Sequence, residues 1–397
     1  MMLLELLLWS LAAVGGVPAL IFAMEVLLCL LRPPALEERG DRPVQPVGEA
    51  VTVIVPAHNE QAMLPGTLAV LKREVRDPRS ILVVADNCTD ATAALAEAAG
   101  VRVLRRENRQ RLGKSHALAA ALQHLEADPP AVVAVVDADA QPAPGALRRI
   151  TRMAQRLNRP VQGLYVFDQP ASGNAKRAIS WLAILFKNAI RPVGWARVGG
   201  PCLITGNAFA VPWALTRKVA FDNTALAEDT QLSVDFAVAG YPPVTCPTAL
   251  VNSPMAPHDR AAWAQRTRWE QGHLHTMLTQ IPRLLVHAVW RAEARLLLMA
   301  IDLLVPPLSL AALLWAGALA VTATAALTEG PAGPAVFLAL CGGVMGGAVL
   351  AGWHRYARGV IRVADLLAVP WYVLWKVPIY ARFLFARQVE WLRTDRS

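Results

Sequence analysis

Val-Thr-Val-Ile-Val-Pro-Ala-His-Asn-Glu, residues 51–60, is an aliphatic and β-branched run that ends in polar side chains. Its composition predicts a buried strand over 51–55 that leads into a loop. Similar short aliphatic runs follow at 81–85, 101–104 and 132–136. We therefore expect four strands in the first third of the chain.

The segments between these strands have helical patterns, at about 60–74, 90–99 and 114–126. Strands that alternate with helices are typical of an α/β domain, in which helices cover both faces of a parallel sheet. Ligands of such sheets bind beyond the carboxyl ends of the strands. The polar residues that follow each strand are thus candidates for a binding site.

Upstream of this domain, residues 3–31 form an apolar run that is interrupted by Glu5 and Glu25. The run is long enough to cross a membrane. It has no basic segment before it and is too long for the apolar part of a signal peptide, so we interpret it as an anchor. Arginines after the anchor place the next domain in the cytoplasm; they are Arg32, Arg39 and Arg42.

Downstream of the domain, apolar runs at about 297–327 and 333–352 predict a membrane hairpin. The turn between them has no lysine or arginine and should face outside, whereas arginines flank the other two ends. A third stretch, 366–386, contains Lys376, which is costly at the centre of a bilayer, and aromatic residues that suit the headgroup boundary. We predict an interfacial or re-entrant helix there, with a further span as the alternative.

The predicted organisation has four parts, an anchor, a linker, a cytoplasmic α/β domain and a C-terminal membrane region, at 1–32, 33–50, 51–282 and 283–397. The composition agrees, because 55% of the residues are hydrophobic and 17% are charged, against roughly a quarter in soluble proteins. The net charge of +9 could indicate nucleic-acid binding, but no basic stripe with interleaved aromatic residues occurs. Positive loops at a membrane therefore explain the charge better, and we expect no nucleic-acid partner.

The five cysteines are far apart and form no CxxC pair. This spacing argues against a zinc site and against a disulfide framework. A reduced, cytoplasmic domain is consistent with it.

Asp137 and Asp139 follow the fourth predicted strand, with one residue between them. Two carboxylates so placed can bind one Mg²⁺ or Mn²⁺, which prefers oxygen ligands and bridges diphosphate oxygens. Such a cation neutralises the charge that builds up on a departing nucleoside diphosphate. The same spacing occurs in ordinary turns, and the position after a buried strand is what favours a metal site here.

Glu228 and Asp229 open a predicted helix that continues over 230–239. Acidic residues at a helix start are favourable by themselves, which is the simpler explanation. The functional alternative is a general base, because an acceptor hydroxyl must lose its proton as it attacks an anomeric carbon, and a positioned carboxylate can take that proton.

The run Gln265-Arg266-Thr267-Arg268-Trp269 lies on a predicted helix after the last loop of the α/β domain. Its arginines could clamp a diphosphate and its tryptophan could stack on a sugar. A helix at the membrane surface is the alternative. We interpret the nearby His273 and His275 as structural or interfacial residues.

In their order along the chain, these motifs resemble those of the family 2 glycosyltransferases of the cellulose, hyaluronan and poly-N-acetylglucosamine synthase kind, and those of ceramide glucosyltransferase. The resemblance covers about residues 50–280 and implies a GT-A fold. The matching pieces are Val55-Pro56-Ala57-His58-Asn59-Glu60, Asp86, Gly113-Lys114, Asp137-Ala138-Asp139, Glu228-Asp229 and the Q-x-x-R-W run at 265–269.

The resemblance also implies a role for each matching residue. The residues implied to hold the uridine and ribose are Pro56, Ala57, Glu60 and Asp86. Lys114 would lie near the nucleotide, Asp137 near the donor sugar, and Asp139 would bind Mg²⁺ or Mn²⁺. Asp229 would be the base and Arg268 would hold the diphosphate. The residues implied to form the acceptor site are Gly206, Glu228, Gln265 and Trp269.

The implied function is an inverting transfer from a UDP-sugar at the cytoplasmic face of the plasma (inner) membrane. A growing polysaccharide is the favoured acceptor because the Q-x-x-R-W run is intact, and three spans would then need an export partner or an oligomer. The small membrane part favours a lipid acceptor instead. A nonenzymatic membrane subunit is disfavoured because every expected carboxylate is present. A dinucleotide oxidoreductase needs a glycine-rich turn after the first strand, and residues 56–59 contain no glycine.

Overall fold

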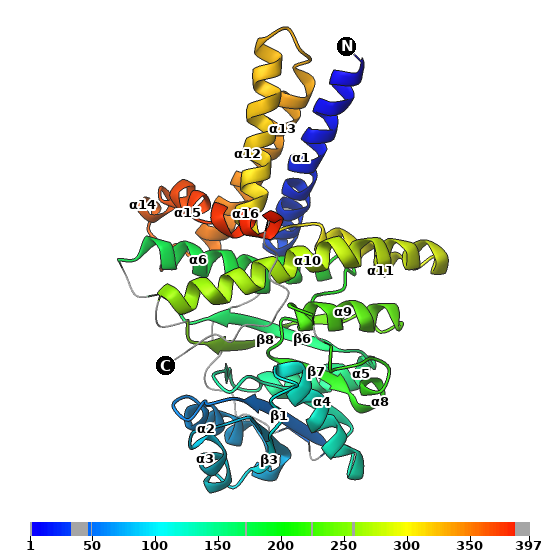
Figure 1. The fold of residues 1–397 in the computed structure, drawn as a ribbon, viewed down its shortest axis with the longest axis vertical. Coiled ribbons are helices and arrows are strands. Elements are labelled where there is room, and N and C mark those ends of the chain that lie inside the picture. The colour runs from blue at the N-terminus through cyan, green and yellow to red at the C-terminus, as the bar shows by residue number, and fades with distance from the viewer. Residues whose placement is uncertain are drawn as a thin grey trace.

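The structure is a computed structural model that describes residues 2–32, 47–48, 50–170, 173–223, 225–255 and 259–385, with side chains from 262 onward in the last range. Most of the predicted linker at 33–50 and the end of the predicted interfacial helix lie outside these residues. The described chain forms three tiers (Figure 1): a sheet domain, a layer of helices above it, and a bundle of three helices that projects from this layer.

The four predicted strands form one half of an eight-stranded sheet with the order β3-β2-β1-β4-β7-β6-β8-β5. Their bounds are β1 (Val51–Ala57), β2 (Ile81–Asp86), β3 (Arg102–Arg106) and β4 (Val132–Val135). All neighbours among them pair in parallel. The predicted α/β fold is therefore confirmed for this half.

The other half of the sheet is mixed, so the prediction of a parallel sheet is corrected there. Its strands are β5 (Gln141–Pro142), β6 (Val161–Phe167), β7 (Phe209–Pro212) and β8 (Val244–Ser253). β7 runs antiparallel to both β4 and β6, while β6 and β8 are parallel. β7 is four residues long and buried throughout, and a short buried run has no sequence feature that indicates its direction.

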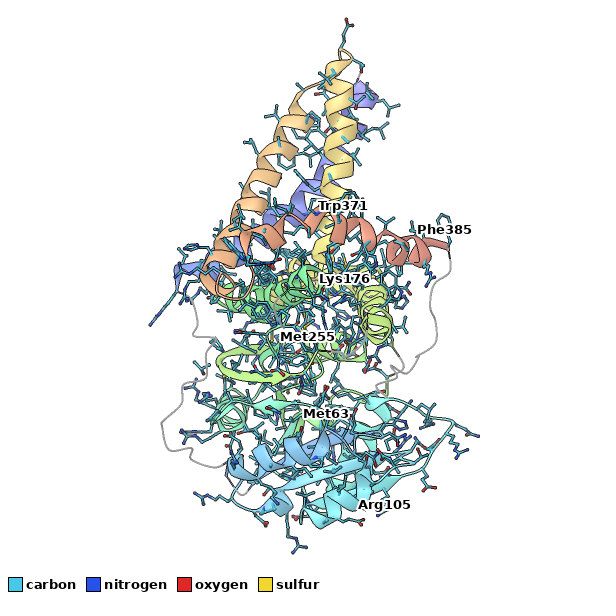
Figure 2. All side chains as sticks on the ribbon, turned by 90° about the vertical axis from the view of Figure 1, so that its left-hand side faces the viewer. Met63, Arg105, Lys176, Met255, Trp371 and Phe385 are labelled. Carbon is cyan, nitrogen blue, oxygen red and sulfur yellow. The ribbon has the colours of Figure 1, made fainter. Side chains whose placement is uncertain are left out.

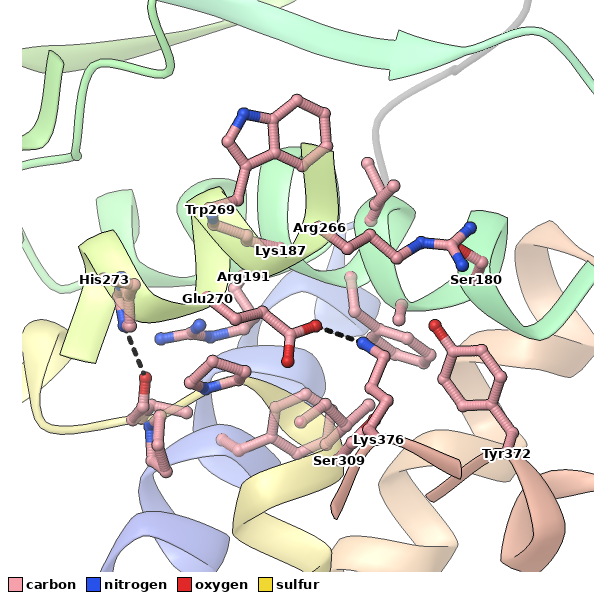
Figure 3. A pocket seen from close by; sticks show the side chains of 18 residues that line it. Ser180, Lys187, Arg191, Arg266, Trp269, Glu270, His273, Ser309, Tyr372 and Lys376 are labelled. Atoms are coloured by element: carbon pink, nitrogen blue, oxygen red, sulfur yellow. Dashed lines mark hydrogen bonds and ion pairs between the residues drawn. The ribbon is translucent and has the colours of Figure 1, made fainter. Parts of the chain in front are cut away.

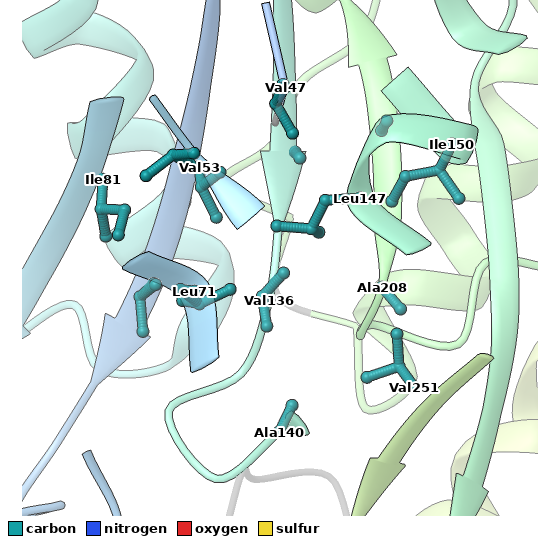
Figure 4. Packing of buried hydrophobic residues seen from close by; sticks show 14 of the residues in the cluster. Val47, Val53, Leu71, Ile81, Val136, Ala140, Leu147, Ile150, Ala208 and Val251 are labelled. Carbon is teal, nitrogen blue, oxygen red and sulfur yellow. The ribbon is translucent and has the colours of Figure 1, made fainter. Parts of the chain in front are cut away.

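Helices cover both faces of the sheet. On one face lie α2 (Leu64–Glu74), α3 (Thr92–Ala98) and α5 (Ala146–Leu157), and on the other lie α4 (Lys114–His124) and α9 (Glu228–Val238). Figure 4 shows Leu71 and Leu147 packed against Val53 of β1 and against Val136, the residue after β4, on the first face. Each such buried aliphatic side chain contributes about 1.5–3 kcal/mol. Short turns complete the domain: η1 (Pro78–Ser80), η2 (Leu125–Ala127) and α8 (Trp213–Thr216).

The bundle consists of α1 (Met2–Leu31), α12 (Leu308–Leu327) and α13 (Gly333–Tyr356). Within the described residues, these three helices are long and apolar enough to cross a membrane. Glycines allow close packing between them: Gly16 lies against Phe337, and Gly342 lies against Trp315.

The apolar run at 297–327, predicted as one span, forms two helices in the structure. α11 (Ala294–Leu303) ends before Val305-Pro306-Pro307, and α12 starts after these residues. A proline lacks the N–H that a helix needs and restricts the residue before it. α11 therefore leaves the bundle and packs beside α10 (Asp259–Arg291) in the helical layer (Figure 1).

The helical layer separates the sheet from the bundle (Figures 1 and 2). Besides α10 and α11, it contains α6 (Ala175–Leu185), the π-helical turn η3 (Phe186–Ile190), α7 (Arg191–Ala196), α14 (Val363–Leu366), α15 (Val369–Trp375) and α16 (Val377–Phe385). The last three occupy the stretch predicted as interfacial or re-entrant, and they lie at the base of the bundle. Their surface includes exposed Trp371 and Phe385, which suits a boundary with lipid headgroups.

A buried charge network joins the layer to the bundle. The Arg191 guanidinium, at the start of α7, donates hydrogen bonds to the Glu25 carboxylate of α1 and, at 2.9 Å, to the Asp302 carboxylate of α11. Gly194 packs so closely that a Cβ there would overlap the Glu25 carbonyl oxygen. Glu25, in the first apolar run, and Asp302, in the run at 297–327, are therefore structural, and with Arg191 they fix the helical layer to the bundle.

Candidate active site

Three segments that are far apart in the sequence meet at the Lys114 side chain. Lys114 is the first residue of α4, and its ammonium contacts the Asp137 carboxylate and the Gly206 carbonyl oxygen. Asp137 follows β4, and Gly206 lies in the loop before β7. Both therefore lie at the edge of the sheet where the parallel strand β4 ends, as expected for a ligand site.

Asp229 belongs to the same constellation. It lies in the first turn of α9, where its Oδ1 accepts a hydrogen bond of 2.7 Å from the Thr230 N–H. Gly206 has φ +79°, and a Cβ on it would lie 3.0 Å from Asp229 Oδ2 and 3.6 Å from Lys114 Nζ. The predicted base, the predicted nucleotide lysine and the predicted acceptor-site glycine are thus direct neighbours.

Glu228 adds a second carboxyl group beside Asp229. Burial and the adjacent Asp229 raise the pKa of Glu228 to about 7, whereas Arg268 and Lys114 oppose this shift. Arg268 belongs to α10. This helix packs closely against the start of α9 because Gly272 has no side chain: a Cβ on Gly272 would lie only 3.1 Å from the Cβ of Ala227. The site therefore combines two cations, Lys114 and Arg268, with three carboxyl groups, those of Asp137, Glu228 and Asp229.

The Q-x-x-R-W run is divided between two faces of α10. Gln265, Arg268 and Gly272 recur at a helical spacing, and Arg268 and Gly272 face α9. The next face carries Arg266, Trp269 and His273, which line a cavity beneath the bundle (Figure 3). The two faces of the motif therefore border different surroundings, Glu228 at the start of α9 on one face and the cavity on the other.

This cavity has a volume of about 80 Å³ and lies between α6, η3, α10 and the first turn of α12. Trp269 stacks on Phe167 of β6, with ring centroids 6.1 Å apart and an interplanar angle of 25°. Gln265 lines a smaller neighbouring pocket with Lys176 and Phe167, and Trp269 borders both. Trp269 and Gln265, two of the predicted acceptor residues, thus both line a pocket.

The predicted metal residues fit a hard cation of the Mg²⁺ or Mn²⁺ type. Asp139 is 6% exposed, and Asp137 is oriented through its N–H, which donates to Asn207 Oδ1 at 3.1 Å. In the described part of the chain, no cluster of three or more acidic, histidine or cysteine side chains could hold a metal by itself. One or two carboxylates are nevertheless sufficient for Mg²⁺, which takes its other ligands from phosphates and water.

The predicted nucleotide residues lie along the ends of β1 and β2. Pro56 and Ala57 end β1, and the Glu60 N–H donates to Thr92 Oγ1 at 2.8 Å. The Asp86 carboxylate at the end of β2 pairs with the Arg106 guanidinium of β3. Sequence reasoning missed Arg106, because the strand register that places it opposite Asp86 had to be known first.

Lys187 is a second residue that sequence reasoning missed. It lies in the π-helical turn η3 and lines the cavity. Burial lowers the pKa of its ammonium, and the carboxylates of Asp229 and Glu270 oppose this. The sequence did contain an indication of Lys187, because it is the one charged residue between 178 and 190. In the structure it lies in a π-turn, and such turns are frequent at functional sites.

His273 and His275 differ in environment. The His273 ring nitrogen Nε2 lies 3.2 Å from the Val305 carbonyl oxygen, and burial together with Lys187 lowers its pKa to about 3. Its imidazole is therefore neutral and donates to Val305, at the junction between α11 and α12. His275 is exposed.

The fold and the site together define a glycosyltransferase of the GT-A class. Residues 132–353, more than half of the chain, match the family described as glycosyl transferase family group 2, and residues 52–204 match glycosyl transferase family 2. The chain belongs to this group of glycosyl transferases, which confirms the enzyme class expected from its motifs.

Known proteins with sequences similar to this chain are also named glycosyltransferases. The probable glycosyltransferase YdaM of Bacillus subtilis is 27% identical over 245 residues, which are 57% of this chain and 56% of that protein. An uncharacterized glycosyltransferase of Mycobacterium tuberculosis is 35% identical over 125 residues, 30% of this chain and 53% of that protein. The chain spans about half the length of these curated relatives.

A mannosyltransferase from Pyrobaculum calidifontis, solved in complex with GDP-mannose and Mn²⁺, has a similar fold, with a TM-score of 0.54 and 20% identity. The similarity covers 97% of this chain and all of that one. It therefore extends over the sheet domain, the helical layer and the membrane helices.

Proposed function

We propose that this protein is an inverting glycosyltransferase that moves a sugar from a nucleotide-sugar donor to an acceptor at the membrane surface. The observation that carries the proposal is the meeting of Asp229, Lys114 and Gly206 at the edge of the sheet. A base and a cation lie side by side there, as the transfer of a sugar from a diphosphate requires.

In the proposed reaction, the acceptor oxygen attacks the anomeric carbon on the face opposite the diphosphate. Asp229 accepts the hydroxyl proton as the new glycosidic bond forms. The bond between the anomeric carbon and the phosphate oxygen breaks, and its electron pair leaves with the diphosphate. Because the attack is in line, an α-linked donor gives a β-linked product.

The departing diphosphate gains negative charge, and the cations Arg268 and Lys114 lie where they can stabilise it. Asp139 and Asp137 would hold Mg²⁺ or Mn²⁺, which would supply further neutralisation of that charge. Asp86, Glu60, Pro56 and Ala57 would bind the nucleoside at the ends of β1 and β2. A UDP-sugar is the donor we expect, and GDP-sugars belong in the test because the Pyrobaculum calidifontis enzyme binds one.

For the acceptor, the position of the cavity favours a lipid. The cavity is bordered by Trp269 and Lys187 on the side of Asp229 and by Phe22 of α1 and Leu308 of α12 on the side of the bundle. An amphiphile could enter there from the bilayer and present a hydroxyl to Asp229. The intact Q-x-x-R-W run keeps a growing polysaccharide as the second candidate, which would make the enzyme synthase-like and would require an export partner or an oligomer.

We place the sheet domain at the cytoplasmic face of the plasma (inner) membrane. The arginines that flank the membrane helices on the side of the sheet support this orientation, as does the lack of lysine and arginine in the turn between α12 and α13.

The test is a donor screen with purified full-length protein in membrane-lipid vesicles. Released nucleoside diphosphate is measured with UDP- and GDP-sugars, with and without EDTA, and the product is sized after solvent extraction. We expect one donor to be consumed in a metal-dependent manner and its sugar to enter the lipid phase. A high-molecular-weight product would select the polysaccharide, and a lack of turnover with every donor would refute the proposal.

A further inference from the structure

Two of the four cations that line the cavity beneath the bundle are already neutralised. Arg191 pairs with Glu25 and Asp302, and Lys376 pairs with Glu270. Figure 3 shows the second of these pairs on the cavity wall. The remaining two cations, Arg266 and Lys187, have no carboxylate partner among the described residues.

The Arg266 side chain is 8% exposed and directed into the cavity (Figure 3). None of the described residues accepts a hydrogen bond from its guanidinium, and its recorded contact is with the Trp375 ring, whose centroid is 6.0 Å away. A guanidinium has five N–H donors, and leaving them unpaired in a buried site is costly. An arginine in this state indicates an anionic ligand.

Lys187 projects into the same space from η3. Lys187 lies in the interior of the protein. Its side chain still has free surface, because the side chain reaches into the open space of the cavity and does not pack against the cavity walls. Among the described residues, no carboxylate lies within ion-pair distance of its ammonium. It therefore adds a second unpaired positive charge on another wall.

Two neutral donors complete the polar end of the cavity. Ser180 Oγ and the Tyr372 hydroxyl are buried and have no hydrogen-bond partner in the described structure. Both line the cavity, and in Figure 3 they lie on the same side as the Arg266 guanidinium. A cluster of cations and hydroxyl groups suits a phosphate, which offers several acceptor oxygens around one centre.

The rest of the cavity is apolar. Phe22, Ile184, Pro307 and Leu308 line it, and Phe22 and Leu308 belong to the membrane helices α1 and α12. A soluble phosphate would gain nothing from these side chains, whereas an acyl or prenyl chain would bury apolar surface against them. The two halves of the cavity therefore match the two ends of an amphiphile.

We infer that this cavity binds an amphiphilic lipid whose headgroup carries a phosphate, held by Arg266 and Lys187 with Ser180 and Tyr372. The inference rests on the proposed function in one respect, namely that this lipid is the acceptor. Lys187 lines the cavity and its ammonium interacts electrostatically with the Asp229 carboxylate, so a headgroup hydroxyl beside the phosphate would be near the base.

The test measures the binding of short-chain lipids to full-length protein in an uncharged detergent by calorimetry. Dioctanoyl phosphatidic acid should bind with one saturable site, at least about tenfold more tightly than dioctanoylglycerol. R266Q and K187M should each weaken the binding of phosphatidic acid by about tenfold. R266K, which keeps the charge, should recover part of the loss.

R358Q is the matched control. Arg358 is exposed at the base of the bundle, just after α13, so its loss removes the same charge near the membrane without touching the cavity, and binding should stay at the wild-type value. Equal affinity for the neutral lipid, or wild-type binding by both R266Q and K187M, would overturn the inference. Competition by inorganic phosphate at the same concentration as the lipid would also overturn it, because the site would then serve a soluble ion.

Donor turnover, measured on the same samples, separates this inference from the proposed function. Release of nucleoside diphosphate without any preference for phosphate-bearing lipids would overturn the inference and leave the transferase assignment intact. Tight binding of phosphatidic acid without turnover of any donor would support the phosphate site and contradict the transferase assignment.

Discussion

At the scale of single residues, Gly206 shows how backbone geometry and chemistry coincide. Its φ of +79° is unfavourable for any side chain, and a Cβ there would press on Asp229 Oδ2. Glycine therefore lets a base, a lysine and a carbonyl oxygen share one point. The sequence indicated Gly206 only through its family resemblance, because a positive φ cannot be recognised from a single chain.

We expect Gly206→Ala to fold but to transfer sugar slowly. The added methyl group displaces the Asp229 carboxylate, and small displacements of a catalytic group reduce rates by about 100-fold. The expected result is a lower kcat with a nearly unchanged KM for the donor, measured by nucleoside diphosphate release. Gly240→Ala is the control, since Gly240 also has a positive φ but no atom within 4 Å of its Cβ position. Equal activity of the two variants would contradict the packing argument.

The raised pKa of Glu228 predicts a pH-dependent stability. The folded chain holds the Glu228 proton up to about pH 7, whereas the unfolded chain releases it near pH 4.3. The stabilising effect of this proton is complete below about pH 4.3 and is lost as the pH rises to about 7.

Glu228→Gln removes this dependence. Without donor, the variant should melt at a higher temperature than the wild type at pH 8, by up to about 2 kcal/mol of unfolding free energy after allowance for partial exposure, and at nearly the same temperature at pH 4.5. Thermal unfolding in detergent at the two pH values measures the difference. If the variant and the wild type differed in melting temperature by the same amount at pH 4.5 and at pH 8, the proton on Glu228 would not be the cause of the difference.

At the scale of elements, the strands and helices over 51–126 were predictable because aliphatic runs alternate there with helical patterns and are bounded by polar loops, although α3 and β3 are only seven and five residues long. The antiparallel β7 was not, because four buried residues carry no direction. The turn η3 and the break between α11 and α12 depend on neighbours as well as on local sequence. The consecutive prolines Pro306 and Pro307 nevertheless indicated in the sequence that a helix ends there.

The charge network at Arg191 connects the helical layer, through α7 and α11, to α1 of the bundle. Arg191→Met leaves the carboxylates of Glu25 and Asp302 buried without their partner, which should cost about 3–5 kcal/mol. Thermal unfolding of the full-length protein should show a large decrease in melting temperature. The triple variant with Glu25→Gln and Asp302→Asn should recover much of it, and a lack of recovery would contradict the account.

At the scale of the whole molecule, the predicted anchor α1 lies with the C-terminal helices α12 and α13 in one bundle, and a layer of helices connects this bundle to the sheet domain. The carboxylates of the site were identifiable from their spacing and order. The cavity was not, because its walls come from α1, α6, α10, α12 and α15, and only the folded chain brings these together. Arg266 lay inside a motif already quoted, and a position two residues before Arg268 on the predicted helix places the two side chains on different faces. The sequence did not indicate that a cavity lies on the Arg266 side.

The proposed orientation predicts that the turn between α12 and α13 lies outside the cell. In a Cys88→Ser background, Glu329→Cys should react with a membrane-impermeant maleimide added to intact cells. Arg109→Cys, in the loop before α4, should react only after the cells are opened. If position 109 alone were labelled in intact cells, the orientation would be the reverse of the one proposed.

The account as a whole depends on Asp229 acting as the base between the donor and the membrane cavity. The decisive measurement compares sugar transfer and donor affinity in Asp229→Asn, which preserves the size of the side chain. We predict that transfer falls by about 1,000-fold while the Kd for the donor changes by less than about threefold. Transfer at the wild-type rate by Asp229→Asn would contradict the account.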